Sequence, residues 1–227
     1  MIKEIRNFED FLENLYCAGI SMGGENSEGI FTLCDYFKDN VLWHTGEPDT
    51  DPWEWRIRVL NEKDDIAYGK LFFKKSGYIT KEWYPYFYAV RRGSNELQEE
   101  YEEGKVSQHA KKIYELLCEY RELPIHLIKR YGGFSKEDKT KFDNAVTELQ
   151  MKFYITMCGR ARKKSRSGEE FGWSSTVFCL AEDFFDEEVI READKIDYDE
   201  AYKKIEEKIY ELNPQADPKK IRKFILG

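Results

Sequence analysis

Indole rings and carboxylates lie close together in the segment WHTGEPDTDPWEW, which spans residues 43–55. An indole ring can stack on a base extruded from a duplex, and a carboxylate can activate water for hydrolysis of a glycosidic bond. The candidate base-stacking rings are Trp43, Trp53 and Trp55, and the candidate catalytic groups are His44, Glu47, Asp49 and Asp51. The structural alternative is that the acids are turn and helix-cap residues and that the tryptophans are packing anchors.

A second cluster is basic and falls within seven positions of the chain. It consists of Arg160, Arg162, Lys163, Lys164 and Arg166, and no acidic residue occurs between Glu148 and Glu169. Mutual repulsion opposes such a concentration of positive charge in a hairpin loop. Contact with phosphate groups supplies a reason for it, so this segment is a candidate DNA-backbone contact.

Three further lysines lie at the start of a predicted helix over residues 136–150: Lys136, Lys139 and Lys141. A cation near a helix N-terminus opposes the macrodipole by roughly 0.3–1 kcal/mol. An external anion would relieve that mismatch. We therefore include these lysines, together with Asn144 further along the same helix, among the candidate DNA-binding residues.

Composition excludes several classes of protein. The chain has 227 residues, of which 41% are hydrophobic and 35% charged, and it can bury a core without disulfides or a structural metal. Its five cysteines never form a CxxC pair, which is typical of reduced thiols in a cytoplasm and predicts no metal site. No apolar run reaches the roughly 20 residues of a membrane span, and no dinucleotide or phosphate-loop motif is present, so we expect neither membrane contact nor a cofactor.

Charge is distributed unevenly along the chain. Residues 105–180 hold 15 basic against nine acidic side chains, whereas residues 1–104 hold 12 against 21. The net charge of −8 opposes long-range attraction to DNA, yet a local basic block can still bind phosphates. The alternative is that the basic block is simply a solvated face.

The basic block has the element order of a winged helix-turn-helix. Ser107 is a capping residue for its first helix, Gly132 ends its second, and the third places Phe142, Val146 and Leu149 on one stripe. After residue 151 the period changes from that of a helix to that of a strand. The expected elements are helices over 108–122, 124–131 and 136–150, and strands over 151–159 and 173–181, joined by a loop, the wing, over 160–172.

The first block repeats this order in a divergent form. Asn7 and Asp51 (or Thr50) are candidate helix caps, and the expected elements are helices over 8–18, 52–63 and 81–92, a strand over 66–73, a turn over 74–77 and a return strand over 78–79. The chain end is predicted to be helical and to pack on the body. We thus expect a helix-rich α+β protein with one winged helix, or two in tandem, divided into residues 1–104, 105–182 and 183–227.

Three segments resemble a known family when taken together: WHTGEPDTDPWEW, YGKLFFKKSGYITKEWYPYFY and ELQMKFYITMCGRARKKSRSGEEFGWSSTVFCLAED. They look like the AlkZ-related proteins, relatives of the AlkZ-type winged-helix DNA glycosylases, and the likeness covers roughly residues 30–185. The resemblance implies a DNA-binding scaffold with base excision as its chemistry. The Gln-x-Gln or Gln-x-Asp catalytic motif of those glycosylases is absent, so the resemblance supplies no catalytic residue.

Three hypotheses follow from these patterns. The first is a cytoplasmic winged-helix protein that binds duplex or damaged DNA through residues 160–168 and the helix over 136–150. The second is a glycosylase-like hydrolase that uses a carboxylate from residues 47–54. The third is a winged helix that contacts another protein and does not bind DNA; a large exposed apolar patch would favour it.

Overall fold

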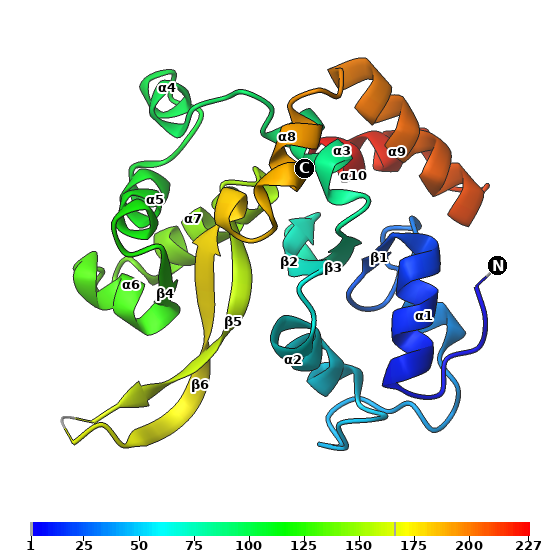
Figure 1. The fold of residues 1–227 in the computed structure, drawn as a ribbon, viewed down its shortest axis with the longest axis horizontal. Coiled ribbons are helices and arrows are strands. Elements are labelled where there is room, and N and C mark those ends of the chain that lie inside the picture. Colours follow the sequence, from blue (N-terminus) through cyan, green and yellow to red (C-terminus); the bar gives the residue numbers. More distant parts are fainter. Residues whose placement is uncertain (1, 166) are drawn as a thin grey trace. The chain divides into compact units, whose positions relative to one another are not determined.

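The computed structural model describes residues 2–165 and 167–227, except for the side chains of Lys164 and Trp173, and it is an α+β structure, as the sequence predicts (Figure 1). The chain forms two compact units. Unit 1 comprises Met1–Ser94 and Phe185–Gly227, and unit 2 comprises Asn95–Phe184. Within the described residues, no helix combines the length and the apolar character needed to cross a membrane.

Unit 1 combines helices with a small antiparallel sheet in the order β1-β3-β2. Its N-terminal elements are α1 (Phe8–Ala18), β1 (Ile20–Met22), the 3₁₀ helix η1 (Leu33–Tyr36), α2 (Pro52–Glu62), β2 (Ile66–Phe72), β3 (Lys75–Thr80) and α3 (Tyr84–Arg91). Its C-terminal elements are α8 (Glu187–Ala193), α9 (Tyr198–Leu212) and α10 (Pro218–Leu226).

Side-chain caps start several of these helices. The Asn7 side chain accepts a hydrogen bond from the Asp10 N–H, and Asp51 accepts one from the Trp53 N–H. Asp197 and Asp217 cap α9 and α10 in the same way. Each cap satisfies an N–H that has no partner within its helix, so these helix starts were predictable from local sequence.

The hairpin turn of unit 1 differs from the prediction. The predicted turn over 74–77 is wrong, because β3 already begins at Lys75, and the return strand predicted over 78–79 is confirmed but extends over Lys75–Thr80. The turn consists of Phe73 and Lys74, whose φ angles are 50° and 61°. Two consecutive left-handed residues give the twist that joins antiparallel strands tightly, and such turns usually carry Asn or Gly. The absence of those residues concealed the turn.

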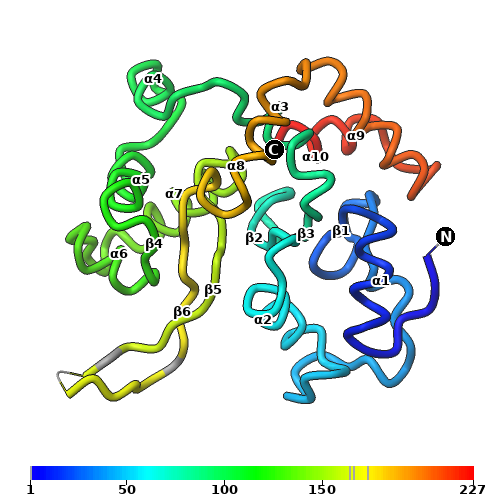
Figure 2. The backbone as a smooth tube through the Cα atoms, viewed as in Figure 1, coloured from blue at the N-terminus to red at the C-terminus, as the bar shows by residue number. Residues whose placement is uncertain are grey.

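The C-terminal helices belong to unit 1, and Figure 2 shows their backbone beside α3. Helix α3 packs against α8, α9 and α10. The rings of Phe72 on β2 and Phe224 on α10 stack with their centroids 3.9 Å apart. Arg91, at the end of α3, is buried and donates to the backbone carbonyls of Leu71, Phe224 and Ile225.

A carboxylate bridges two further parts of unit 1. Glu28 pairs with Lys75 on β3, at 2.9 Å, and with Lys220 on α10, at 2.6 Å. Hydrogen bonds from these two ammonium groups lower the pKa of the Glu28 carboxyl to about 2. Glu28 therefore ties a loop to a strand and to the C-terminal helix.

We expect the contribution of Glu28 to stability to depend on pH. Because its pKa is lower in the folded chain than in the unfolded chain, the contribution is full above the ordinary glutamate pKa and declines as the pH falls toward 2. The difference between the melting temperatures of the parent and of Glu28→Gln should therefore be largest at pH 7 and should shrink steadily as the pH falls from 4.5 toward 2. A difference that stays constant over this range would contradict the prediction.

Unit 2 places helices beside a sheet in the order β4-β6-β5. Its elements are α4 (Leu97–Glu102), α5 (Gln108–Tyr120), β4 (Glu122–Pro124), α6 (Ile125–Tyr131), α7 (Lys139–Met151), β5 (Ile155–Lys164), β6 (Glu170–Leu180) and the 3₁₀ helix η2 (Ala181–Asp183). The predicted order of three helices followed by a hairpin is confirmed. The predicted burial of Phe142, Val146, Leu149 and Ile155 is confirmed as well.

Three boundaries in unit 2 differ from the prediction. Helix α7 begins at Lys139, not at residue 136, because Asp138 accepts hydrogen bonds from the Ser135 N–H and hydroxyl and stabilises a preceding turn. The same helix continues to Met151, so β5 begins only at Ile155. Helix α5 ends at Tyr120, because the next residue, Arg121, has a φ of 64°. The short strand β4 follows Arg121.

Candidate nucleic-acid interface

The basic cluster lies mainly on a strand, which corrects the prediction of a loop over residues 160–172. Strand β5 extends to Lys164 and pairs with β6 from Glu170 onward, so the connecting loop is short. The register shifts between Ala161 and Lys163, where Arg162 on β5 lies opposite the three β6 residues 172–174, so the extra residues are on β6. Such a bulge increases the local twist of the ribbon.

The cations of this hairpin differ in their surroundings. Arg160 is held by Ser174, since its Nε donates to Oγ at 3.0 Å and an Nη donates to the carbonyl at 2.7 Å. Arg162 and Lys163 are exposed, and neither forms an ion pair within the described part of the chain. The predicted contact Arg166, and the side chain of Lys164, lie outside what the structure describes.

His126 connects helix α6 to the hairpin. Its Nδ1 lies 2.7 Å from the hydroxyl oxygen of Ser175 on β6. Desolvation lowers the pKa of His126, and the positive charge of Lys163 lowers it further. Desolvation and the nearby cation thus favour the neutral form of His126. The contact between His126 and Ser175 joins α6 to the hairpin.

The candidate residues of α7 face solvent. Lys139, Lys141 and Asn144 are exposed on the helix, and Lys136 is exposed in the turn before it. Three acids of this region are already engaged, whereas Glu137, next to Lys136, is exposed. Asp138 binds Ser135, Asp143 lies 3.9 Å from Lys129, and Glu148 accepts from the Ser107 hydroxyl. In the described residues, no ion pair involves Lys136, Lys139 or Lys141, so these charges are available to an anion.

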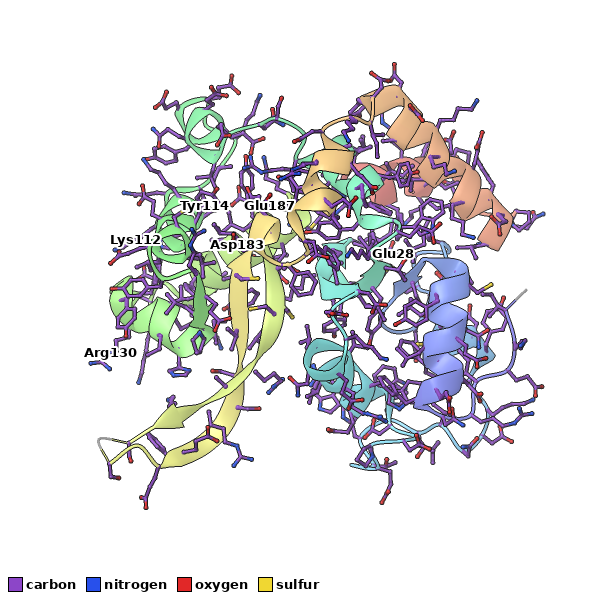
Figure 3. All side chains as sticks on the ribbon, viewed as in Figure 1. Glu28, Lys112, Tyr114, Arg130, Asp183 and Glu187 are labelled. Atoms are coloured by element: carbon purple, nitrogen blue, oxygen red, sulfur yellow. The ribbon has the colours of Figure 1, made fainter. Side chains whose placement is uncertain are left out.

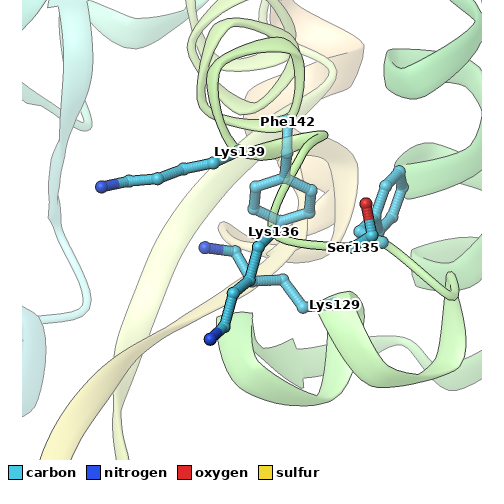
Figure 4. Close-up of a pocket in the computed structure, with 6 residues that line it drawn as sticks. Lys129, Ser135, Lys136, Lys139 and Phe142 are labelled. Carbon is cyan, nitrogen blue, oxygen red and sulfur yellow. The ribbon is translucent and has the colours of Figure 1, made fainter.

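Two cations of α6 were not among the predicted contacts. Lys129 and Arg130 lie in the last turn of that helix, and no sequence pattern separates them from ordinary C-terminal helix cations. Figure 3 labels exposed Arg130 and also Lys112, whose ammonium lies 5.5 Å from the centroid of the Phe134 ring. Lys129 faces α7 and lines a pocket with Lys136 and Lys139 (Figure 4).

In the acidic and aromatic cluster, Asp51 has a structural role. It is fully buried, and its carboxylate accepts hydrogen bonds from the backbone N–H groups of His44, Gly46 and Trp53. Burial alone raises the pKa of this carboxyl, but the backbone donors outweigh that effect and hold it below its ordinary value. Asp51 thus organises the loop before α2, and its oxygen atoms are occupied.

The tryptophans of this cluster separate into core and surface. Trp55 is fully buried and its ring centroid lies 5.1 Å from that of Phe11, so it leaves the set of base-stacking candidates. Trp43 and Trp53 are each 40% exposed. The Trp53 ring is contacted by His44, with centroids 4.7 Å apart, and by the guanidinium of Arg56, whose carbon lies 3.1 Å from the ring centroid.

Three carboxylates of the cluster remain: Glu54 is half-buried in the first turn of α2, and the other two are on the surface. Glu47 is exposed, and Asp49 is exposed with one oxygen 3.8 Å from a nitrogen of Arg58. Neither is joined to Asp51 by a side-chain hydrogen bond among the described residues. The arrangement supports the capping alternative for Asp51 and supplies no pair of carboxylates with shared chemistry.

Asp51→Ala is therefore expected to reduce stability by about 2 kcal/mol, the upper range for loss of a helix cap, because additional loop N–H groups also lose their acceptor. Urea unfolding measures the effect. Asp49→Ala is the matched control, since its exposed carboxylate makes only a long ion pair, and it should stay within about 0.5 kcal/mol of the parent. Equal stability of the two variants would contradict the capping role.

The structure thus presents an α+β protein whose second unit exposes unpaired cations on a helix and a neighbouring hairpin, with no metal-binding group of three or more His, Cys, Asp or Glu among the described residues. A family model described as AlkZ related matches residues 5–226, and the chain belongs to this AlkZ-related family. Comparisons with curated proteins and with solved structures gave no match.

Proposed function

We propose that the chain binds duplex DNA through unit 2, with α7 and the β5–β6 hairpin as the contacting elements. One observation carries the proposal: exposed cations without ion-pair partners among the described residues occur on both elements. They are Lys139 and Lys141 at the start of α7, Lys136 in the turn before it, and Arg162 and Lys163 on β5. Phosphate neutralisation by Lys and Arg is the main source of affinity for duplex DNA.

The proposed fold of unit 2 is a winged helix. Its element order supports this interpretation, because three helices precede a hairpin, and the connection between α6 and α7, residues 132–138, contains Gly132 and Gly133. Strand β4, between α5 and α6, pairs with β6 and so attaches the helices to the hairpin. In such a unit α7 would enter the major groove and the hairpin would contact the adjacent backbone.

Family membership also supports the proposal that the chain binds DNA. The AlkZ-related proteins resemble the AlkZ-type DNA glycosylases, which are DNA-binding proteins built from winged helices, and the match covers nearly the whole chain. We limit the proposal to binding, because the Gln-x-Gln or Gln-x-Asp motif is absent and the buried Asp51 acts as a cap. The exposed residues Trp43 and Trp53 remain candidates for contact with a damaged or extruded base.

The test is the salt dependence of duplex DNA binding, measured by fluorescence anisotropy. Each phosphate contact that is lost should reduce the slope of log K against log salt by about 0.9, so R162Q/K163Q should flatten it by about two units. The effect should be similar for unrelated DNA sequences, because phosphate contacts carry no base information. The melting temperature should change little, since neither side chain forms an ion pair with the described residues.

The matched control is K195Q/K219Q. It removes the same net charge from exposed positions of unit 1. A local phosphate contact predicts a larger change for the hairpin variant, whereas a general charge effect predicts equal changes. Failure of the parent to bind DNA, or equal slopes for the two double variants, would reject the proposed interface and leave the protein-contacting winged helix as the better interpretation.

A further inference from the structure

A pocket of about 330 Å³ lies between the end of α6 and the start of α7 (Figure 4). Its lining combines three lysines with two phenylalanine rings and one hydroxyl: Lys129, Phe134, Ser135, Lys136, Lys139 and Phe142. The three lysine side chains extend to the same side of Phe142 in this view. The pocket therefore has an aromatic wall and a cationic rim.

The aromatic wall is held in place by close packing. The rings of Phe134 and Phe142 meet edge to face, with centroids 4.8 Å apart, and Phe142 is fully buried. Gly132 leaves the space that Phe134 occupies, since a Cβ at that position would lie 2.2 Å from a ring carbon. Phe142 belongs to the folded core, and the half-buried Phe134 packs against that core, so Phe134 supplies the accessible face of the wall.

The rim holds more positive than negative charge. The Lys129 ammonium lies 4.7 Å from the centroid of the Phe142 ring, and its only carboxylate contact among those described is the long one to Asp143, at 3.9 Å. Lys136 and Lys139 are exposed and have no ion-pair partner within the described chain. Ser135 adds a hydroxyl, which already donates to Asp138 and can still accept.

We infer that this pocket binds a single nucleotide unit, with the base against Phe134 and the phosphate between Lys136 and Lys139. The volume falls at the lower end of the range for small-molecule sites, which suits one base with its sugar and phosphate. Aromatic side chains stack with bases of any type, and lysine binds phosphate as a point charge. A purely apolar ligand would leave the lysines unused, and inorganic phosphate alone would leave the aromatic wall unused.

This site goes beyond the proposed contact with a duplex backbone. The bound nucleotide has two possible sources: a free nucleoside monophosphate, or a nucleotide at an unpaired position of a DNA strand. Both present the same base and phosphate. Because the hairpin cations Arg162 and Lys163 do not line the pocket, nucleotide binding and duplex binding are separable by mutation.

The test is calorimetric titration of the full chain with deoxyadenosine monophosphate, deoxyadenosine and inorganic phosphate. We expect the monophosphate to bind at least tenfold more tightly than either fragment. Phe134→Leu should weaken binding of the monophosphate about tenfold, the lower range for loss of one stacking contact. Phe134→Tyr, which keeps the ring, should retain binding, and K136Q/K139Q should lose it.

The R162Q/K163Q variant separates this inference from the proposed function, because it should bind the monophosphate as the parent does even where duplex binding is weakened. Competition by single-stranded oligodeoxyadenylate identifies the source, with concentrations expressed as nucleotide units. If the oligonucleotide displaces bound monophosphate at a lower concentration than free monophosphate does, the site takes a nucleotide of a strand. If it does so only at a higher concentration, the site takes the free nucleotide. The inference is overturned if the monophosphate binds no more tightly than inorganic phosphate, or if Phe134→Leu with an unchanged melting temperature binds it normally.

Discussion

Arg91→Met is expected to reduce the free energy of unfolding by about 3 kcal/mol or more, a large part of the stability of an ordinary domain. The buried guanidinium donates to three backbone carbonyls, including that of Ile225 at 2.8 Å. Two of these acceptors, Phe224 and Ile225, lie in the last turn of α10, where carbonyls have no partner within the helix. Methionine fills similar space but leaves buried acceptors without a donor.

The charge of Arg91 adds to this effect. Desolvation lowers the pKa of Arg91 to about 9, so the side chain is still charged at neutral pH and interacts favourably with the negative end of the α10 dipole. Arg91→Lys should recover only part of the stability, because one ammonium cannot reproduce the planar fork that reaches carbonyls of β2 and α10 together.

Urea unfolding at pH 7 provides the measurement for Arg91. The matched control is Arg222→Met, which removes an exposed arginine from α10 and should stay within about 0.5 kcal/mol of the parent. Equal midpoints for the two methionine variants would contradict the anchoring role of Arg91.

Arg91 also illustrates which features the sequence could not supply. The cap residues Asn7, Ser107 and Asp197 were predictable because each binds an N–H within three residues of itself. The acceptors of Arg91 on α10 lie 133 and 134 residues away in sequence, and local patterns carry no information on that contact. From the sequence alone, Arg91 is identified only as a basic residue at the end of an aromatic helix.

The candidate sites show the same limit. The loop over 160–172 was predicted from polarity, but the length of β5 depends on its pairing with residues 170–176 of β6, which polarity does not reveal. Trp53 and Trp55 look equivalent in sequence. Trp55 and Val59, however, are four residues apart on one face of α2, and both are buried, whereas Trp53 is exposed. That spacing was a usable signal for assigning Trp55 to the core.

Phe142→Ala is expected to destabilise unit 2 by about 3–5 kcal/mol, the usual range when a fully buried phenylalanine is truncated. The ring lies in the core cluster that joins α5, α6 and α7, together with Ile113, Leu117 and Leu149. Its removal leaves a cavity that the surrounding helices can close only in part. The same ring supports Phe134 and carries the Lys129 ammonium, so its loss also disturbs the nucleotide pocket.

Thr140→Ala is the matched control for Phe142→Ala, because Thr140 is exposed on the same helix and should be nearly neutral. Urea unfolding followed by tryptophan fluorescence and by circular dichroism gives the free energy of each variant. If the core of unit 2 supports α7 as the structure indicates, Phe142→Ala lowers the midpoint of unfolding and the control does not. A loss below about 1 kcal/mol would mean that α7 is held by contacts outside this core, and the lysines at its start would then lack the rigid support that phosphate binding requires.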